Sequence, residues 1–389
     1  MIIKSDRIYT DKGIVDGYLE IKGSKIINIL ESYDGEVTKD FTGYRILPGL
    51  IDTHNHGAFG YMFDTSNKEE LKRLLKSYAS QGLTGIFATT DKADQYPILA
   101  ELSREEINGT KILGIHSEGP WGSRSGENSK GASYPEVDMD YAKELYEKAN
   151  GLLKVFDIAP EVKGSDDLIK YFTEKGVVVS AFHTNANFEE MNEAFDKGIS
   201  NVIHLYNVMT GIHHRKPGAV SASILREDVT CELICDGLHV SLPVIELTLR
   251  MKDNSKIIMI SDNVLYASLP QGKYKGFTDD ENNDRSIIEV TKEGFVLSKT
   301  GRLSGSSFPV IYGIKNLVEK LHHPLEEVVK LASLNPARKY GLTNKGEIKE
   351  ANDADFIIVD SDLEVINTYV EGMCVFDKNV DKIYINEDF

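Results

Sequence analysis

The stretch GVVVSAFHTNANFEEMNEAFDKGISNVIHLYN, residues 176–207, decides how the rest of the chain is interpreted. An apolar, β-branched run begins at Val177 and stops at His183, and a polar segment with helical periodicity follows. A second short apolar run then stops at His204. This order predicts strand, helix, strand, with both strand ends on one side of a parallel sheet. Alone, either histidine would be read as an ordinary polar residue, but two in consecutive units favour a metal site, because neutral imidazole is a common zinc ligand.

The same alternation of strand and helix extends through the body of the chain. Helical patterns such as 68–80, 141–149, 188–197 and 243–251 separate the apolar runs. Eight strands, each followed by a helix, predict an α/β fold of the (β/α)8 TIM-barrel type. An open doubly wound sheet would alternate in the same way, but no glycine-rich phosphate loop follows the first strand. The predicted strands are 48–54, 85–89, 111–116, 152–158, 177–183, 201–204, 230–236 and 256–262.

Both ends of the chain differ from this body. Residues 1–46 and 345–389 contain short alternating strands separated by turns, the first of the second group at 345–348. Neither end has enough strands for a sheet of its own, so we expect the two to fold together as a small β-sandwich domain beside a 47–344 barrel. The long segment 263–307 is rich in Gly, Asp and Asn, and it predicts a hairpin over the barrel mouth from 287–290 and 294–297.

Composition limits the function further. The chain has 389 residues, 41% of them hydrophobic, and a net charge of −17. Such an acidic chain is not expected to bind nucleic acid or an anionic membrane, and an anionic substrate would need a local cationic pocket. No apolar run reaches membrane-spanning length, and the first residues lack the layout of a signal peptide. The three cysteines form no CxxC pair, which suits a cytoplasmic location.

The carboxyl ends of the predicted strands gather imidazoles and carboxylates, and this is where barrel enzymes place their active sites. Glu118, His183 and His204 form a carboxylate and two-imidazole set, which is a catalytic zinc pattern with one position left for water. Asp262, at the end of the eighth strand, is the natural general base for that water.

His54 and His56 form a second candidate metal site. Residues i and i+2 of a strand face the same side, so both imidazoles could reach one ion, or they could only hydrogen-bond around the site. The number of bound ions, one or two, therefore remains open. Zinc is expected first, but iron, manganese and cobalt suit the same ligands. Arg215 would be a fit donor for a phosphate or carboxylate, although alone it reads as a surface arginine.

Taken together, these motifs resemble the amidohydrolase superfamily and, within it, the N-acetylglucosamine-6-phosphate deacetylase family. The Pro-Gly-Leu-Ile-Asp and His-Asn-His stretches mark the superfamily. The His-Leu-Tyr-Asn-Val-Met, Asp-Gly-Leu-His and Leu-Ser-Gly-Ser stretches together mark the deacetylases. In order along the chain the motifs are 48–57, 116–121, 183–186, 204–209, 236–239, 261–262 and 303–306.

The resemblance implies metal-dependent hydrolysis of the acetamide of an N-acetylhexosamine 6-phosphate, with release of acetate. It implies Glu118, His183 and His204 as ligands of the essential metal, and Asp262 as the acid/base. It also implies a homodimer, because in the family part of the phosphate pocket comes from a neighbouring subunit. The implied sugar contacts are Asn207, Val208, Leu303, Ser304, Gly305, Ala132 and Ser133, and the implied phosphate ligands are Arg215 and His239.

Departures from the family pattern fall around the sugar, for example at 263–266 and at Ser133, so they affect substrate identity more than reaction type. The gluco and galacto epimers stay open. Another amidohydrolase, acting on a cyclic amide or a dipeptide, is the first alternative. Many such enzymes use a carboxylated lysine at the end of strand four, where this chain has Asp157 and Ile158. A catalytically inactive barrel used as a scaffold is the second alternative.

Overall fold

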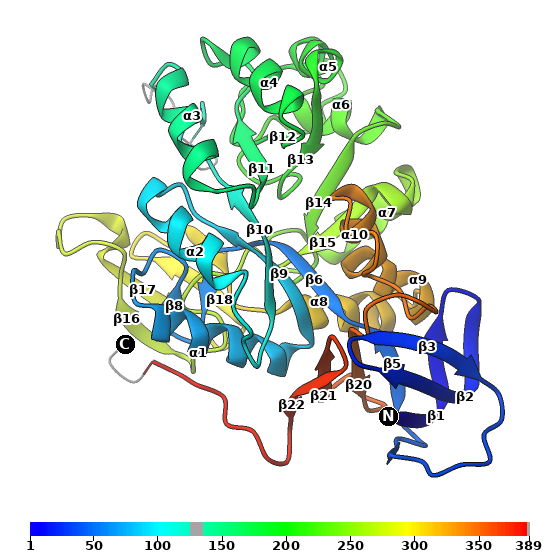
Figure 1. The fold of residues 1–389 in the computed structure, drawn as a ribbon. Helices are drawn as coiled ribbons and strands as arrows, with labels where there is room; N and C mark the ends of the chain where they lie inside the picture. Colours follow the sequence, from blue (N-terminus) through cyan, green and yellow to red (C-terminus); the bar gives the residue numbers. More distant parts are fainter. Residues whose placement is uncertain (125–134, 387–389) are drawn as a thin grey trace.

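The computed structural model describes residues 1–124 and 135–386 of the chain, and its main body is a nearly closed parallel β-barrel. The barrel strands are hydrogen-bonded in the order β15-β14-β13-β12-β11-β10-β9-β6 (Figure 1). Between the two end strands, Asp262 N donates to His54 O (3.0 Å) and His56 N donates to Asn263 O (2.8 Å). The strands are β6 (Leu50–Asn55), β9 (Leu83–Thr89), β10 (Lys111–Ser117), β11 (Leu153–Ile158), β12 (Val178–Ala181), β13 (Ile199–Val202), β14 (Thr230–Ile234) and β15 (Ile257–Ile260).

Helices surround this barrel, as the alternation predicted. In Figure 1 they lie outside the strands and cover the outer face of the barrel. The inner faces of the strands pack against one another, so each strand is buried on both faces, which explains the continuous apolar runs. All eight predicted strands and the four example helices are present, and the (β/α)8 fold is confirmed. The helices are α1 (Lys68–Tyr78), α2 (Tyr96–Leu102), α3 (Met139–Lys148), α4 (Ser165–Glu174), α5 (Phe188–Lys197), α6 (Ala219–Leu225), α7 (Leu242–Met251), α8 (Val310–Lys315), α9 (Leu325–Val328) and α10 (Leu334–Lys339).

The deciding stretch shows why the alternation is encoded locally. Helix α5 begins at a capping box, in which Asn187 Oδ1 accepts from Glu190 N (3.0 Å) and Glu190 Oε2 accepts from Asn187 N (2.8 Å). Its buried face consists of Met191, Ala194 and Phe195, at helical spacing. The chain then turns at Gly198 (φ 129°) directly into β13.

Strands from both ends of the chain form one further sheet, in the order β22-β21-β20-β5-β1-β2-β3, with β4 beside β1. Figure 1 shows the blue amino-terminal strands next to the orange and red carboxyl-terminal ones. The two ends meet where β5 pairs antiparallel with β20, opposing Pro48 to Phe356. The strands are β1 (Ile2–Thr10), β2 (Gly13–Lys22), β3 (Lys25–Leu30), β4 (Lys39–Asp40), β5 (Arg45–Pro48), β20 (Phe356–Val359), β21 (Val365–Val370) and β22 (Met373–Asp377).

The prediction of a small β domain from both ends is confirmed, but the strand expected at 345–348 is absent. Only Ile348 forms an isolated bridge, to Thr10. Lys345 instead extends its ammonium group to the carboxylates of Asp353 (3.0 Å) and Asp355 (2.6 Å). The backbone turns at Gly346 (φ 85°), so the segment is not extended there.

The segment between β15 and α8 carries its own four-stranded antiparallel sheet, which we call the lid sheet. It contains the predicted hairpin of β17 (Ile287–Val290) and β18 (Phe295–Ser298). Two further strands, β16 (Gly272–Lys275) and β19 (Leu303–Ser306), flank it. Main-chain bonds tie the lid sheet to the barrel end, because Ser306 N donates to Asp262 O (2.9 Å). Within the described residues, no helix is long and apolar enough to cross a membrane.

Candidate metal centre and active site

Three of the predicted site residues occupy equivalent places in the barrel. His183, His204 and Asp262 each lie two residues beyond the end of their strand, at Ala181, Val202 and Ile260. All three have positive φ values, of 38°, 30° and 52°. The left-handed region is unfavourable for residues with a side chain, and such strain gathers at functional sites. The strands therefore end earlier than predicted, and the sharp turn places each polar side chain at the barrel rim.

The carboxylate of Glu118, directly after β10, lies at the centre of the rim cluster. Its Oε1 atom is 3.4 Å from His204 Nε2, 3.7 Å from His54 Nε2 and 4.0 Å from His183 Nε2. Its Oε2 atom is 3.1 Å from His56 Nε2. Glu118 therefore faces both pairs of imidazoles, with His54, His183 and His204 near Oε1 and His56 near Oε2. Ligand atoms of Glu118, His183 and His204 all lie within 4.8 Å of one another, and so do those of His54, His56 and Glu118.

Asp262 faces the same space from the last strand of the barrel. Its Oδ1 atom is 3.4 Å from His54 Nε2 and 3.6 Å from His56 Nε2. Burial opposes ionisation, but the close approach of the His54 imidazole lowers the pKa of Asp262 to about 2. The structure thus brings all six rim residues together: His54, His56, Glu118, His183, His204 and Asp262.

Several buried nitrogens of this cluster lack a hydrogen-bond partner among the described residues. Both ring nitrogens of His54 and Nδ1 of His204 are in this state. Buried polar atoms are rarely left unpaired in folded proteins, so these nitrogens need another partner. Burial and then the neighbouring His204 imidazole lower the pKa of His183 to about 4, which favours the neutral imidazole that a metal ligand needs. These donors fit a divalent ion.

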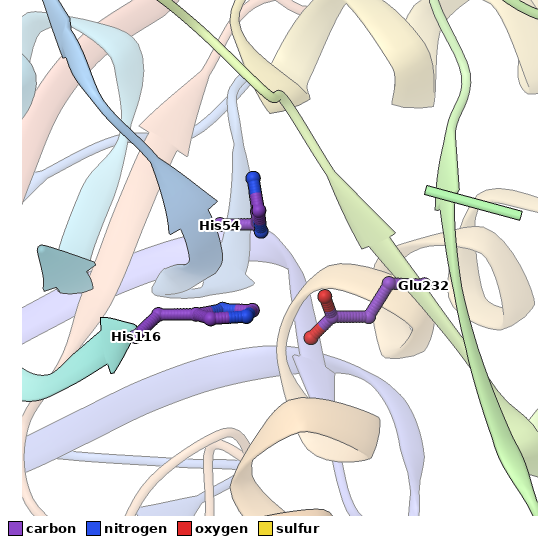
Figure 2. Close-up of side chains that lie close together, drawn as sticks. All are labelled: His54, His116 and Glu232. Atoms are coloured by element: carbon purple, nitrogen blue, oxygen red, sulfur yellow. The ribbon is translucent and has the colours of Figure 1, made fainter. Parts of the chain in front are cut away.

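A second polar cluster lies behind the first, inside the barrel. Figure 2 shows His54, His116 and Glu232 pointing toward one another from β6, β10 and β14. The rings of His54 and His116 meet edge to face, with 4.5 Å between their centres. All three side chains are fully buried. By residue type alone, this cluster resembles a third place for an ion.

The hydrogen bonds of the inner cluster argue against an ion there. His116 Nδ1 lies 2.6 Å from Thr53 O and His116 Nε2 lies 2.9 Å from Asp157 Oδ2, so both ring nitrogens face acceptors. Burial works against the charge, yet Asp157 raises the pKa of His116 to about 9. A doubly donating imidazolium has no lone pair for a metal. Glu232 Oε1 accepts from Thr53 Oγ1 (2.7 Å) and the Tyr340 hydroxyl (2.8 Å), whereas Glu232 Oε2 and Asp157 Oδ1 have no partner among the described residues. The case against an ion here therefore rests on His116.

A cavity of about 940 Å³ opens over the rim cluster. Its walls include six of the predicted substrate-binding residues, and they come from the loops after β13 and β14 and from the lid sheet. These six are Asn207, Val208, His239, Leu303, Ser304 and Gly305. Arg215 is not a wall residue of this cavity; it is exposed on the loop before α6. Ala132 and Ser133 lie outside the described residues.

His239 is held in place by its own loop. Its Nδ1 atom lies 2.7 Å from Asp236 Oδ2, and Asp236 Oδ1 also accepts from the main-chain N–H groups of Leu238 and His239. Burial opposes the charge, but the hydrogen bond to Asp236 raises the pKa of His239. Since Nδ1 is occupied, Nε2 is the ring nitrogen left to donate to an anion in the cavity.

Sequence reasoning missed four residues that the structure brings to this region. Glu232 was a lone charge within an apolar strand, and His116 preceded Glu118 by two positions. Both residues stood out in the sequence, but the residues that they contact could not be predicted from it. Arg285 and Arg302 line the cavity from the lid sheet. Arg302 directly precedes the Leu303–Gly305 stretch, and that adjacency was the only available signal.

Comparison with known proteins agrees with this geometry. The sequence model of the amidohydrolase family matches residues 45–386 of this chain. The chain belongs to the amidohydrolase family. It is 31% identical to the N-acetylglucosamine-6-phosphate deacetylase of Vibrio furnissii over 93% of this chain and 91% of that protein. It is 30% identical to the deacetylase of that name from Bacillus subtilis, over 98% of this chain and 99% of the relative.

Solved amidohydrolase structures share the whole architecture. A mutant N-acetyl-D-glucosamine-6-phosphate deacetylase from Mycobacterium smegmatis, in complex with N-acetyl-D-glucosamine 6-phosphate, superposes with a TM-score of 0.87 at 25% identity. The match covers 96% of this chain and 99% of that one. A β-aspartyl dipeptidase from Fervidobacterium islandicum, at 18% identity and a TM-score of 0.62, shares the fold alone.

Proposed function

We propose that this chain hydrolyses the acetamide of N-acetyl-D-glucosamine 6-phosphate to D-glucosamine 6-phosphate and acetate. One observation carries the proposal above the others. In a chain of this family, Glu118 faces two pairs of imidazoles, with Asp262 facing the same space at the base of a cavity of about 940 Å³. Fold alone would not establish an activity, but this arrangement of ligands and base matches the chemistry of amide hydrolysis.

Glu118, His183 and His204 would hold the essential divalent ion, with zinc as the first choice and iron, manganese or cobalt as alternatives. When bound, the ion would polarise the amide carbonyl and lower the pKa of the attacking water. His54 and His56, together with Glu118, would hold a second ion if two are bound. The unpartnered nitrogens of His54 support the two-ion arrangement.

Asp262 would act as the acid/base. Its lowered pKa keeps the carboxylate ionised at neutral pH, so it can accept a proton from the attacking water. The same proton then passes to the nitrogen of the departing amino sugar as the C–N bond breaks. Asn207, Val208 and the Leu303–Gly305 stretch would contact the sugar, as would Ala132 and Ser133.

The phosphate ligands in this proposal are His239 and Arg215. His239 lines the cavity of its own chain, whereas Arg215 is exposed on a loop outside it. An exposed arginine is in a position to serve a neighbouring subunit, which supports the proposed homodimer. We further infer a cytoplasmic enzyme, supported by three cysteines that form no disulfide. The units 1–46, 47–344 and 345–389 remain our proposed domain boundaries.

The galacto epimer is the second candidate substrate. The chain is 28% identical to the N-acetylgalactosamine-6-phosphate deacetylase of Escherichia coli O157:H7, over 95% of this chain and 98% of that protein. The deciding experiment is acetate release from the two epimeric 6-phosphates, with a hydantoin and a β-aspartyl dipeptide as controls. We expect the highest kcat/KM on the gluco epimer. Turnover of the cyclic amide or the dipeptide alone would overturn the proposal.

A further inference from the structure

Two arginines of the lid sheet line the same cavity as the metal centre. Arg285 lies just before β17, and Arg302 lies in the turn between β18 and β19, next to Leu303. They are part of the wall formed by the chain itself, unlike Arg215. In a protein with a net charge of −17, guanidinium groups at a cavity of this size call for an explanation.

The lid sheet holds the two arginines together through the carboxylate of Asp284. Asp284 Oδ1 accepts from Thr300 N (2.8 Å), and Asp284 Oδ2 accepts from Ser298 Oγ (2.7 Å). The Ser298 hydroxyl oxygen in turn accepts from Arg302 N (3.2 Å). Asp284 therefore ties the turn that carries Arg302 to the segment that carries Arg285, and its own oxygens are engaged in the process. The carboxylate closest in sequence to Arg285 is used as a brace.

The guanidinium group of Arg285 makes no ion pair and no side-chain hydrogen bond with the residues that the structure describes. It lies over the ring of Phe277, 4.8 Å from the ring centre. This contact fixes the plane of the group while leaving its N–H donors available. Burial and the positive charge of Arg302 lower the pKa of Arg285, which is consistent with two like charges close together. An anion bound near the two guanidinium groups would relieve the repulsion between their charges.

We propose that Arg285 and Arg302 form an anion-binding site on the lid sheet that grips the phosphate of the substrate. This assignment rests on the proposed function. Guanidinium groups match the geometry of phosphate oxygens and bind them through parallel hydrogen bonds. The lid sheet thereby supplies the cationic pocket that an acidic enzyme needs for an anionic sugar, and it couples phosphate recognition to the Leu303–Gly305 stretch.

The test uses the full-length, metal-loaded enzyme and the variants Arg285→Met and Arg302→Met, which keep most of the apolar stem. Lys299→Met is the matched control. This substitution removes one positive charge from the same turn. The Nζ atom of Lys299 donates to Glu281 O (2.6 Å), and Lys299 does not line the cavity. We expect each arginine variant to raise KM for the phosphorylated sugar roughly 10- to 100-fold, with kcat within about threefold.

Two comparisons make the result decisive. The kcat/KM for unphosphorylated N-acetyl-D-glucosamine should stay unchanged in the arginine variants, and Lys299→Met should match the wild type on both substrates. Equal losses on both sugars, or no loss on either, would overturn the proposal. Calorimetric binding of D-glucose 6-phosphate, which has no acetamide, separates this site from the activity. If the wild type binds it and the arginine variants bind it equally well, or if the wild type does not bind it, the anion site is wrong even if deacetylation is correct.

Discussion

Two clusters of histidines and carboxylates share His54, and they differ in how their polar atoms are satisfied. In the inner cluster, both nitrogens of His116 face protein acceptors, and Glu232 accepts two hydroxyl donors. At the rim, both nitrogens of His54 and Nδ1 of His204 have no partner among the described residues. Protein acceptors thus occupy both nitrogens of His116 in the inner cluster, whereas imidazole nitrogens at the rim are left without a partner. Among the carboxylates, Glu232 Oε2 and Asp157 Oδ1 of the inner cluster also lack a partner among the described residues, so the contrast is carried by the imidazoles.

Backbone strain follows the same division. His183, His204 and Asp262 at the rim all have left-handed φ values, whereas His116 and Glu232 lie within regular strands. Strained residues persist only where the surrounding structure holds them, and they gather at functional sites. Residue type is therefore a weaker guide to a metal site than unpartnered donors and backbone strain together.

The largest difference between the two clusters is expected when the glutamate of each is substituted. Glu118→Gln should lower kcat/KM by about 10³-fold or more, because the carboxylate that faces the two imidazole pairs is lost. Elemental analysis should find the bound metal largely gone. Glu232→Gln, the matched change in the inner cluster, should keep its metal. If both variants retained metal equally, Glu118 would not be a ligand.

Asp262→Asn sharpens the comparison within the rim, since this residue is proposed to move a proton and not to hold the essential ion. We expect kcat to fall about 10²- to 10⁴-fold while the metal content stays near that of the wild type. Metal analysis and acetate release on the same preparation provide the measurement. Near-normal turnover would remove Asp262 from the mechanism.

A substitution in the inner cluster should lower the stability of the protein and leave its metal content unchanged. His116→Asn removes one partner of a fully buried pair and leaves Asp157 without its counter-charge, which should lower the free energy of unfolding by about 3 kcal/mol. Denaturant unfolding measures this loss. His183→Asn is the control from the rim: it should change stability of the metal-free protein by less than about 1 kcal/mol while losing metal. The reverse pattern would mean that the two clusters have been assigned the wrong way round.

The smallest effect concerns a second pair of histidine and aspartate, His239 and Asp236, which resembles His116 and Asp157 but borders the cavity. Asp236 raises the pKa of His239, so the imidazolium persists to a higher pH than the ordinary value of about 6.5. Phosphate binding should be strongest below this pKa and weaken as pH rises through it. In Asp236→Asn the pKa falls, so KM should begin to rise at a lower pH.

KM measured between about pH 6 and 9 on both proteins tests this, with an expected difference of about three- to tenfold near neutral pH. The titration of the substrate phosphate is common to both and cancels in the comparison. Superimposable KM profiles would show that His239 does not bind the phosphate in its charged form.

Much of the fold could be predicted from the sequence because periodicity is local. Apolar runs that alternate with helical segments define the units, and capping signals such as Asn187 and Glu190 mark the start of α5. The carboxyl-end rule brings Glu118 near His183 and His204. The strands predicted to end at His183, His204, Asp236 and Asp262 end two residues earlier, whereas the other four ends were right or one residue too early. At the first two of these, apolar character continues through Phe182 and Ile203 while the backbone has already turned. Residue patterns do not report a change in φ.

Other features depended on contacts between distant segments. The hydrogen bonds that satisfy His116 come from β6 and β11, and no spacing in the sequence reveals them. Arg285 and Arg302 line the cavity through the fold of the lid sheet, in which Asp284 bonds to Ser298 and Thr300, so in the sequence they looked like ordinary charges in a polar segment. The sites of Ala132 and Ser133 remain predictions.

The central claim is that the rim cluster holds a divalent ion on which acetamide hydrolysis depends. The most direct test strips the purified protein with a chelator, adds back zinc, iron, manganese or cobalt in steps, and follows acetate release from N-acetyl-D-glucosamine 6-phosphate together with the bound metal. The account predicts an inactive stripped protein whose activity returns in proportion to one or two ions per chain. Full activity in the stripped protein, or no acetate release with any of the four ions, would contradict it.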